Sequence, residues 1–435
     1  MLLIMSLLRK HILHIHHPDR SLDDIHIHLQ HSPEILEHNS QLQLFGLLAK
    51  YKVHIDSEPE WNKMKKVSNI YEYIYLYNKY LDSNIGTALH NPISRSFFKL
   101  YEMIQDLDLL DFNSTSIQKK YVQKETNVHM FNESVQYKKI KKTNSKSKLI
   151  ILGLAEAPGG FMESIYTYRK KQKCFNQDEY YTMSLISEDK DVPNLHKLKD
   201  IITDNTLTLI EGVDGTGSLY NYKNIQHLRT VLPEKADIVT ADGGFNFCEQ
   251  YNYQEQLSYK LIFSEIISAL YVLKKGGHFV LKIFDIFTDN TIDLLYFLSR
   301  FFKDVYIIKP FSSRPANSEK YIVSKGFLGI DETSMDTLLE TLLDWNVLNH
   351  NGKYVQKIFK IKKNKVYKKI QKAICTYNRM FVKEQIKNII TTLVYIKSNM
   401  SYEHKEDIYY TQASICFFWC LKYHMEPNPK CKYLK

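Results

Sequence analysis

The segment DVYIIKPFSSRPANSEKYIVSKGF, residues 304–327, contains two apolar runs joined by a short polar link. The runs DVYIIKP and EKYIVSKGF are rich in Val, Ile and Tyr, which favours β-strands. The link FSSRPANS is too short for the helical crossover that joins parallel strands. We therefore predict that the last strand of a sheet is antiparallel to its neighbour.

Five further apolar runs precede this pair and alternate with helical patterns. Strands that are continuously apolar and alternate with helices are typical of a mostly parallel sheet covered on both faces. The sequence therefore predicts an α/β fold with a seven-stranded sheet whose last strand is antiparallel. The five runs are residues 148–155, 180–186, 207–212, 236–243 and 277–284, and the helix patterns are residues 161–171, 253–275 and 289–302.

The pattern divides the chain into three parts. Residues 1–88 read as a helical region with His-rich interruptions, residues 89–330 carry the strands, and residues 331–435 form a basic region that we expect to be helical. No run of eighteen apolar residues occurs, so we expect no membrane-spanning segment.

The positive charge of the chain is concentrated in two stretches. The net charge is +10, from 58 Lys and Arg against 48 Asp and Glu. Residues 137–148 and 353–372 are rich in Lys and contain no acid. Such runs favour a phosphate backbone as partner, and Tyr354, Phe359 and Tyr367 would be available for base stacking. The alternative is an amphipathic helix that packs its apolar side chains on the core and turns its lysines to water.

The six cysteines show no framework spacing, which favours reduced intracellular thiols. Cys416, Cys420 and His424 are spaced four apart on a predicted helix, a spacing compatible with a metal. Small buried thiols are the favoured interpretation, and we predict no metal.

Ionisable and glycine residues gather where the predicted strands end. Gly159 and Gly160 follow the first strand, and Asp242 ends the fourth. Lys282 lies within the apolar fifth strand, and a buried lysine needs partners or a lowered pKa. Glu319 begins the last strand. Because ligands of such sheets bind beyond the carboxyl ends of the strands, we expect a site there.

Lys99, Asp242, Lys282 and Glu319, in this order, resemble the Lys–Asp–Lys–Glu tetrad of the FtsJ-like ribose 2′-O-methyltransferases. The motifs APGGF, DGTG and LKKGGHFVLK match as well, over roughly residues 90–328. The resemblance implies a Rossmann-like class I methyltransferase sheet and S-adenosylmethionine as cofactor. DGGF together with DGTG is similar to the cap-modifying branch, and the flanking segments resemble viral members.

The resemblance assigns roles to the matching residues. Lys282 would be the general base, with Lys99 as a neighbouring cation that lowers the Lys282 pKa and steers the ribose oxygen. Asp242 and Glu319 would orient the two amines, and Asp242 would also face the donor methyl group. Asp214 would read the adenine amino group. The methionine end of the cofactor would be lined by Glu156, Ala157, Pro158, Gly159, Gly160 and Phe161.

Two positions depart from the family pattern. Gly153 stands where the family usually has an acid that helps to hold the methionine amino group, and Ser218 replaces the final acid of DGTGD. Glu156 is an alternative acid, three residues further on. The changes leave open a second hypothesis, a catalytically weak or inactive homologue that serves as an RNA-binding or scaffold subunit. An oxidoreductase is disfavoured because no G-x-G-x-x-G follows the first strand.

The resemblance also implies partners and a location. The partner is RNA, with capped mRNA as the expected substrate, and the viral resemblance implies a viral transcription or capping machinery. The expected location is the host cytoplasm, with packaging in the virion.

Overall fold

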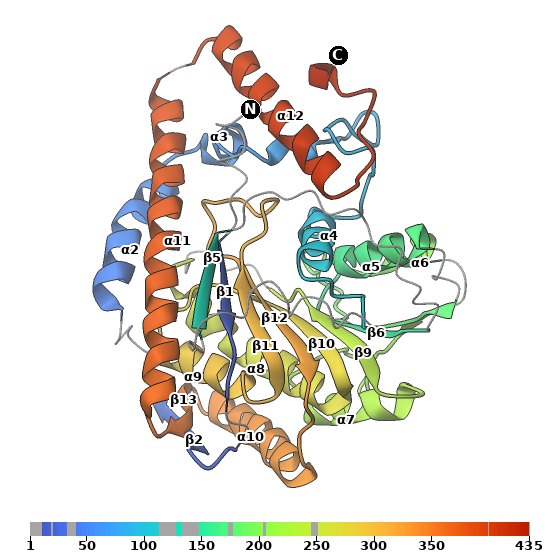
Figure 1. Ribbon diagram of the computed structural model, residues 1–435, viewed down its shortest axis with the longest axis vertical. Helices are drawn as coiled ribbons and strands as arrows, with labels where there is room; N and C mark the ends of the chain where they lie inside the picture. Colours follow the sequence, from blue (N-terminus) through green and yellow to red (C-terminus); the bar gives the residue numbers. More distant parts are fainter. Residues whose placement is uncertain are drawn as a thin grey trace.

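The computed structural model describes residues 11–18, 21–32, 41–112, 128–132, 148–172, 177–202, 206–244, 251–398 and 400–434. Its centre is a nine-stranded mixed sheet with the strand order β5-β1-β11-β12-β10-β9-β6-β7-β8 (Figure 1). The predicted strands are β6 (Ile150–Leu154), β7 (Glu179–Met183), β8 (Leu207–Leu209), β9 (Ala236–Ala241), β10 (Leu273–Ile283), β11 (Phe302–Ile308) and β12 (Lys320–Phe327).

The seven predicted strands and the antiparallel pair are confirmed, but the expected count of seven is corrected to nine because two further strands extend the sheet beyond β11. β6 pairs in parallel with β7 and β9, and β9 pairs in parallel with β10. β12 is antiparallel to both β10 and β11, with Ile308 opposite Tyr321. The carboxyl ends of the parallel strands therefore share one edge with the loop that joins β11 to β12.

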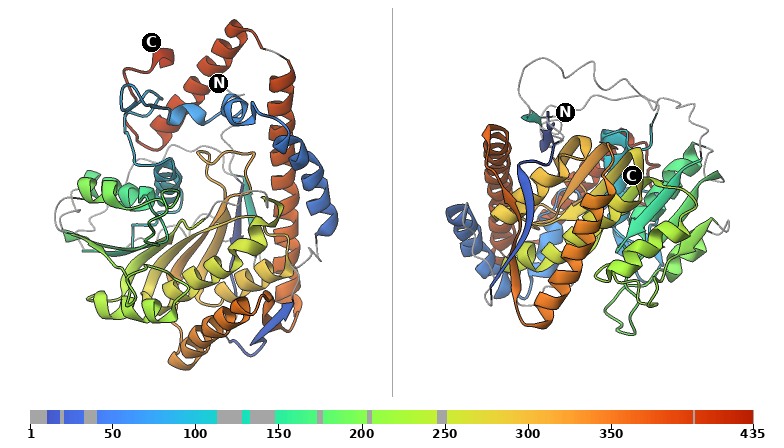
Figure 2. Two further views of the ribbon diagram at one scale, coloured as in Figure 1. Left: turned by 180° about the vertical axis from the view of Figure 1, so that it is seen from behind. Right: turned by 90° about the horizontal axis from the view of Figure 1, so that it is seen from below.

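Helices cover both faces of the sheet, as the alternation of apolar runs predicted (Figure 2). α4 (Ser96–Asp106) and α5 (Gly160–Lys171) pack on one face, where Leu100, Phe161 and Ile238 share a core. The second core lies on the other face, with α7 (Tyr222–Val231), α8 (Gln254–Val272), α9 (Asp289–Leu298) and α10 (Glu332–His350).

The N-terminal region is not purely helical, which corrects the expectation for residues 1–88. α2 (Leu42–Asp56) and α3 (Trp61–Val67) are helices, but β1 (His11–Ile15) pairs antiparallel with β11 and with β5 (Val128–Asn132). β2 (Ile25–Ser32) pairs with a strand from the C-terminal region. The His-rich IHIHL pattern alternates with period two, which is the periodicity of a strand with one buried face.

The basic stretch 353–372 contains a strand, which corrects the expectation of a wholly helical C-terminal region. β13 (Tyr354–Ile361) pairs with β2, and α11 (Lys365–Lys397) and α12 (Tyr402–Lys422) follow. Phe359 and Tyr367 are fully buried and so do not offer faces for base stacking, whereas Tyr354 is 46% exposed. Figure 1 shows β13 beyond the end of the sheet that lies opposite the β11–β12 loop.

Two further expectations concern a basic stretch and the cysteines of α12, and the burial of these cysteines is confirmed. Of the basic stretch 137–148, residues 137–147 lie outside the described residues, and Lys148 forms an ion pair with Glu179. Cys416 and Cys420 are buried in an aromatic cluster with Trp419. Within the described ranges, no group of His, Cys, Asp and Glu side chains could hold a metal ion, and no helix is long and apolar enough to cross a membrane.

Candidate active site

The four predicted catalytic residues meet at the carboxyl edge of the sheet as two ion pairs. Lys99 Nζ, on α4, lies 2.8 Å from Glu319 Oε1 and 2.9 Å from Oε2. Lys282 Nζ, on β10, donates to the backbone oxygen of Asp242 at 2.7 Å and lies 3.4 Å from its carboxylate. The four side chains are 12–13% exposed, so each pair is largely desolvated yet reachable from the edge.

Lysines dominate the electrostatics around Glu319. Burial alone would raise the pKa of this carboxyl, but Lys99, Lys282 and Lys309 outweigh burial and lower the pKa of Glu319 to about 2. Glu319 is therefore ionised across the physiological range and is held between cations.

The pKa of Lys282 moves in the direction opposite to the one expected. Burial lowers it, but Asp242, Glu319 and Glu265 raise it by more, so the Lys282 pKa lies above its ordinary value. Burial and these acids make the largest contributions to this pKa, and Lys99 is not one of them. The net lowering of the Lys282 pKa that the sequence predicted is thus wrong, and Lys282 carries an ammonium.

Sequence reasoning missed three residues that support the tetrad. The Tyr321 hydroxyl donates to Asp242 Oδ1 at 3.1 Å, and the Ser313 hydroxyl donates to Glu319 Oε1 at 2.9 Å. Lys309 Nζ donates to the backbone oxygens of Glu319 and Asn317, at 2.7 and 2.9 Å. Lys309 lies in the apolar run YIIKP as Lys282 lies in FVLKIF, so the same signal was available.

The glycine turn after β6 brings two helices close together. Gly159 is the N-cap of α5 and has a φ of 106°, a left-handed conformation that glycine adopts without strain. A Cβ on Gly160 would lie 2.3 Å from the hydroxyls of Ser94 and Ser96, at the start of α4. Because α4 carries Lys99, the missing side chain of Gly160 lets Lys99 approach the sheet edge.

The predicted cofactor residues of this turn differ in burial. Ala157 and Pro158 are half-buried and lie at the edge. Phe161 is fully buried, and its ring lies 5.6 Å from the ring of Tyr321, so it supports the site from within the core. It does not line an open surface.

The Glu156 carboxylate fills the space that Gly153 leaves empty. A Cβ on Gly153 would lie 1.8 Å from Glu156 Oε1. Glu156 Oε2 accepts a hydrogen bond from the Thr240 hydroxyl at 3.0 Å, whereas Oε1 is buried and makes no hydrogen bond within the described residues. Burial, with help from Asp242 and Glu265, raises the pKa of Glu156 well above its ordinary value. A cationic group placed here would satisfy Oε1 and favour the ionised carboxylate.

Asp214 is tied into its own loop. Its carboxylate accepts hydrogen bonds from the Asn221 and Asn224 side chains at 2.7 and 2.9 Å, and from the Thr216 amide and hydroxyl at 3.0 and 2.7 Å. The amide and hydroxyl donors lower the pKa of Asp214. Val213, in this loop, is 57% exposed, and Leu185 and Ile186, in the loop after β7, are 48 and 52% exposed.

A second acid that the sequence analysis did not select lies beneath the edge. Glu265, on α8, is 1% exposed, and a Cβ on Gly243 would lie 2.2 Å from its Oε1. The Gly243 amide is near enough to favour the charged form, yet neither oxygen completes a hydrogen bond in the described part of the chain. Burial raises the Glu265 pKa well above its ordinary value, and Lys282 opposes that shift.

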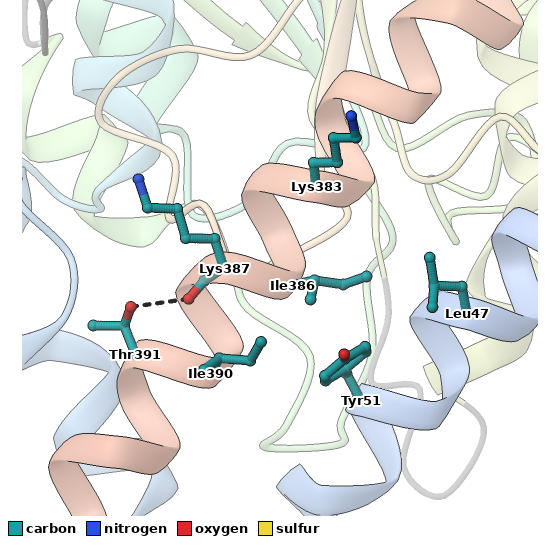
Figure 3. Close-up of a pocket in the computed structure, with 7 residues that line it drawn as sticks. All are labelled: Leu47, Tyr51, Lys383, Ile386, Lys387, Ile390 and Thr391. Atoms are coloured by element: carbon teal, nitrogen blue, oxygen red, sulfur yellow. Dashed lines mark hydrogen bonds between the residues drawn. The ribbon is translucent and has the colours of Figure 1, made fainter.

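A hollow of about 400 Å³ lies elsewhere, between α2 and α11 (Figure 3). Its lining contains none of the tetrad residues, so we place the candidate active site at the sheet edge. The hollow is lined by Leu47, Tyr51, Lys383, Ile386, Lys387, Ile390 and Thr391.

Comparison with known proteins gives the class. The model of the FtsJ-like methyltransferase family matches residues 92–327, more than half of the chain, so the chain belongs to this family. S-adenosylmethionine is accordingly the methyl donor, and it supplies the electrophilic methyl group when bound.

Three curated relatives share one name, cap-specific mRNA (nucleoside-2′-O-)-methyltransferase 1. The mouse protein is 38% identical over 42% of this chain and 22% of its own length, and the Xenopus laevis protein is 30% identical over 68% and 34%. The Trypanosoma brucei protein is 31% identical over 43% and 49%. The chain thus spans about half or less of each relative. A solved structure of a ribosomal RNA methyltransferase, putative, from Plasmodium falciparum is 20% identical, with a TM-score of 0.31, over 42% of this chain and 90% of that one.

The residues at the edge fit this donor. S-adenosylmethionine carries an ammonium on its methionine end, and Glu156 Oε1 is a buried acceptor that receives no hydrogen bond from the described residues. Gly159 is the N-cap of α5, and the positive end of a helix dipole at that position favours a carboxylate. Glu156, Ala157, Pro158 and Gly159 would hold the methionine end, and the apolar side chains of Leu185, Ile186 and Val213 would pack against adenine.

Exchanging the acid between positions 153 and 156 tests the role of Glu156. Glu156→Ala should weaken binding of S-adenosylhomocysteine roughly 10- to 100-fold, because a buried ionic hydrogen bond is lost. Adding Gly153→Asp to that variant should restore most of the affinity, since the new side chain enters the vacated volume. Isothermal titration calorimetry measures both. Unchanged affinity in the single variant would contradict the assignment.

The low pKa of Glu319 predicts how stability depends on pH. A carboxyl whose pKa is lowered by folding stabilises the native state above its unfolded pKa, near 4.3, and loses this contribution as pH falls toward 2. Glu319→Gln should therefore reduce the free energy of unfolding by about 2 kcal/mol more at pH 7 than at pH 3. Urea denaturation at both pH values measures this. An equal loss at both would contradict the lowered pKa.

Proposed function

We propose that this chain is an S-adenosylmethionine-dependent RNA ribose 2′-O-methyltransferase that acts on the cap-proximal nucleotide of mRNA. The observation that carries the proposal is the meeting of the Lys99–Glu319 and Lys282–Asp242 pairs at the carboxyl edge of the sheet. The names of the curated relatives, which refer to cap-specific mRNA methylation, support the choice of RNA and of the cap.

Positioning is the first task of the tetrad. Methyl transfer to a ribose hydroxyl is an in-line displacement, so the oxygen must lie opposite the leaving sulfur. Lys99 and Lys282 point ammonium groups toward the edge, and Glu319 and Asp242 fix them. Because orientation alone supplies several kcal/mol, two cations held in place can bind and align the ribose oxygen before any proton moves.

Removal of the hydroxyl proton is the second task, and we assign it to Lys282. The neighbouring acids raise the pKa of this amine and so keep it protonated. A bound sulfonium would oppose the effect of those acids, and burial under the RNA would lower the Lys282 pKa further. Lys282 would release its proton to solvent as the ligands bind. The neutral amine would then accept the ribose proton as the oxygen attacks, and Asp242 would stabilise the resulting ammonium.

An inactive RNA-binding homologue was the alternative raised by Gly153. Glu156 supplies a carboxylate in the volume beside Gly153, and the tetrad is held by hydrogen bonds from Tyr321 and Ser313. Both features favour an active enzyme, because an RNA scaffold has no need of them.

The resemblance of the flanking segments to viral family members leads us to propose a setting as well. RNA capping by a viral transcription machinery in the host cytoplasm, with packaging in the virion, fits that resemblance. The exposed lysines of α11, among them Lys368, Lys372 and Lys383, are candidates for contacts with the RNA backbone.

Transfer of labelled methyl groups tests the proposed substrate. We expect the chain to methylate a short RNA that carries a methylated guanosine cap and to leave the same RNA without a cap largely unmodified. Nuclease digestion and mass spectrometry would place the methyl group on the 2′-oxygen of the first nucleotide. A chain that binds S-adenosylhomocysteine but modifies neither RNA would favour the scaffold hypothesis.

Substitution of Lys282 separates charge from proton transfer. Lys282→Met should reduce methyl transfer about 1000-fold or more, since it removes both the cation and the base. Lys282→Arg keeps a cation that cannot be deprotonated, so it should remain nearly as inactive. Single-turnover assays measure the rates, and affinity for S-adenosylhomocysteine should change less than about threefold.

Lys275→Met provides the matched control, because Lys275 is exposed on the same strand. Substantial activity in Lys282→Arg would show that Lys282 acts by charge alone.

A further inference from the structure

The loop between β11 and β12 presents Glu319 to Lys99, and its first turn is fixed by one buried carboxylate. The amides of Phe311 and Ser312 donate to Glu102 Oε2 and Oε1 at 2.8 and 2.7 Å. Glu102 is fully buried on α4, three residues after Lys99. α4 therefore carries both Lys99 and Glu102. Glu102 holds the loop that contains Glu319, the ion-pair partner of Lys99.

The third donor to Glu102 comes from the C-terminal helix. Trp419, on α12, donates its indole N–H to Glu102 Oε1 at 2.9 Å and is fully buried. Its ring packs against Phe98, the neighbour of Lys99, with ring centroids 5.6 Å apart. Trp419 lies outside residues 92–327, the part of the chain that matches the family.

Other elements from outside the family match reach the same loop. Arg314 pairs with Glu72, which lies in the short helix η1 (Glu72–Ile74), at 2.7 Å. The Gln385 side chain, on α11, donates to the Ala316 backbone oxygen at 2.9 Å. Figure 1 shows this loop between α11 and α4, with α12 above it. Of these contacts, the one through Glu102 is the most buried and reaches α4 directly.

We propose that Trp419 is a positioning residue for methyl transfer, which acts through Glu102 to fix the Phe311–Ser312 turn and thereby the Lys99–Glu319 pair. A buried carboxylate needs all its donors, because an unsatisfied charged oxygen is costly and relaxes its surroundings. Small displacements of catalytic groups reduce rates strongly. The inference rests on the proposed function, since it assigns Glu319 to that reaction.

Trp419→Phe tests the proposal because it removes the N–H and keeps an aromatic ring in the cluster. We expect kcat for methylation of capped RNA to fall roughly tenfold, with KM for RNA and affinity for S-adenosylhomocysteine unchanged within about threefold. Glu102→Gln, which keeps the shape and weakens the acceptor, should lower kcat at least as much. The stoichiometry of S-adenosylhomocysteine binding counts the folded molecules in each preparation.

Tyr423→Phe is the matched control. The Tyr423 hydroxyl, just beyond the end of α12, donates to Asp106 on α4 at 3.1 Å, so its loss removes one hydrogen bond from the C-terminal region to α4 without reaching the loop. Tyr423→Phe should keep the wild-type kcat. Equal losses of kcat in Trp419→Phe and Tyr423→Phe would overturn the proposal. So would a loss of activity in Trp419→Phe that is fully explained by a smaller fraction of molecules that bind S-adenosylhomocysteine.

Amide hydrogen exchange provides a readout that does not depend on activity. The amides of Phe311 and Ser312 should exchange faster in Trp419→Phe than in the wild type and in Tyr423→Phe. If the wild type methylates no RNA, the proposed function fails, and exchange still decides whether Trp419 fixes the turn. Unchanged exchange at these two amides would overturn the positioning role.

Discussion

The buried ion pair between Lys99 and Glu319 is the interaction on which the arrangement of the sheet edge depends. Both side chains are almost fully buried. Such a pair is favourable only when its geometry is fixed and its remaining donors and acceptors form hydrogen bonds. Its two members lie far apart in the chain, on α4 and immediately before β12. The fold must therefore fix the position of the β11–β12 loop relative to α4. Hydrogen bonds of Glu102, Ser313 and Lys309 do this.

Missing side chains matter as much at this edge as the ones that are present. Gly160 lets α4 approach α5, and the volumes beside Gly153 and Gly243 are occupied by the carboxylates of Glu156 and Glu265. An acid can thus move along the sequence and still place its charge in the same volume, provided that a glycine vacates it.

The sequence predicted what depends on local pattern and missed what depends on distant partners. The seven strands and the antiparallel hairpin follow from short apolar runs and the length of one link, and each was found. β1 and β13 were missed because their partners, β11 and β2, lie hundreds of residues away and leave no local mark beyond a two-residue alternation. The tetrad was predicted because its four residues occur in the order of a family motif. The surroundings of Phe161 and Asp214 could not be predicted in the same way. Phe161 is buried in the core, and the Asp214 carboxylate accepts hydrogen bonds from Asn221 and Asn224.

The elements outside the family match are built into the catalytic edge. α11 holds the backbone after β10 through Asn378, which donates to the Ile286 oxygen at 2.6 Å, and the β11–β12 loop through Gln385. β1 extends the sheet beside β11, the strand that leads into the same loop. A loop that must present a glutamate to a buried lysine has few backbone partners of its own, since it lies beyond the ends of the strands. The N- and C-terminal regions supply those partners, so the rigidity of the tetrad is a property of the whole chain.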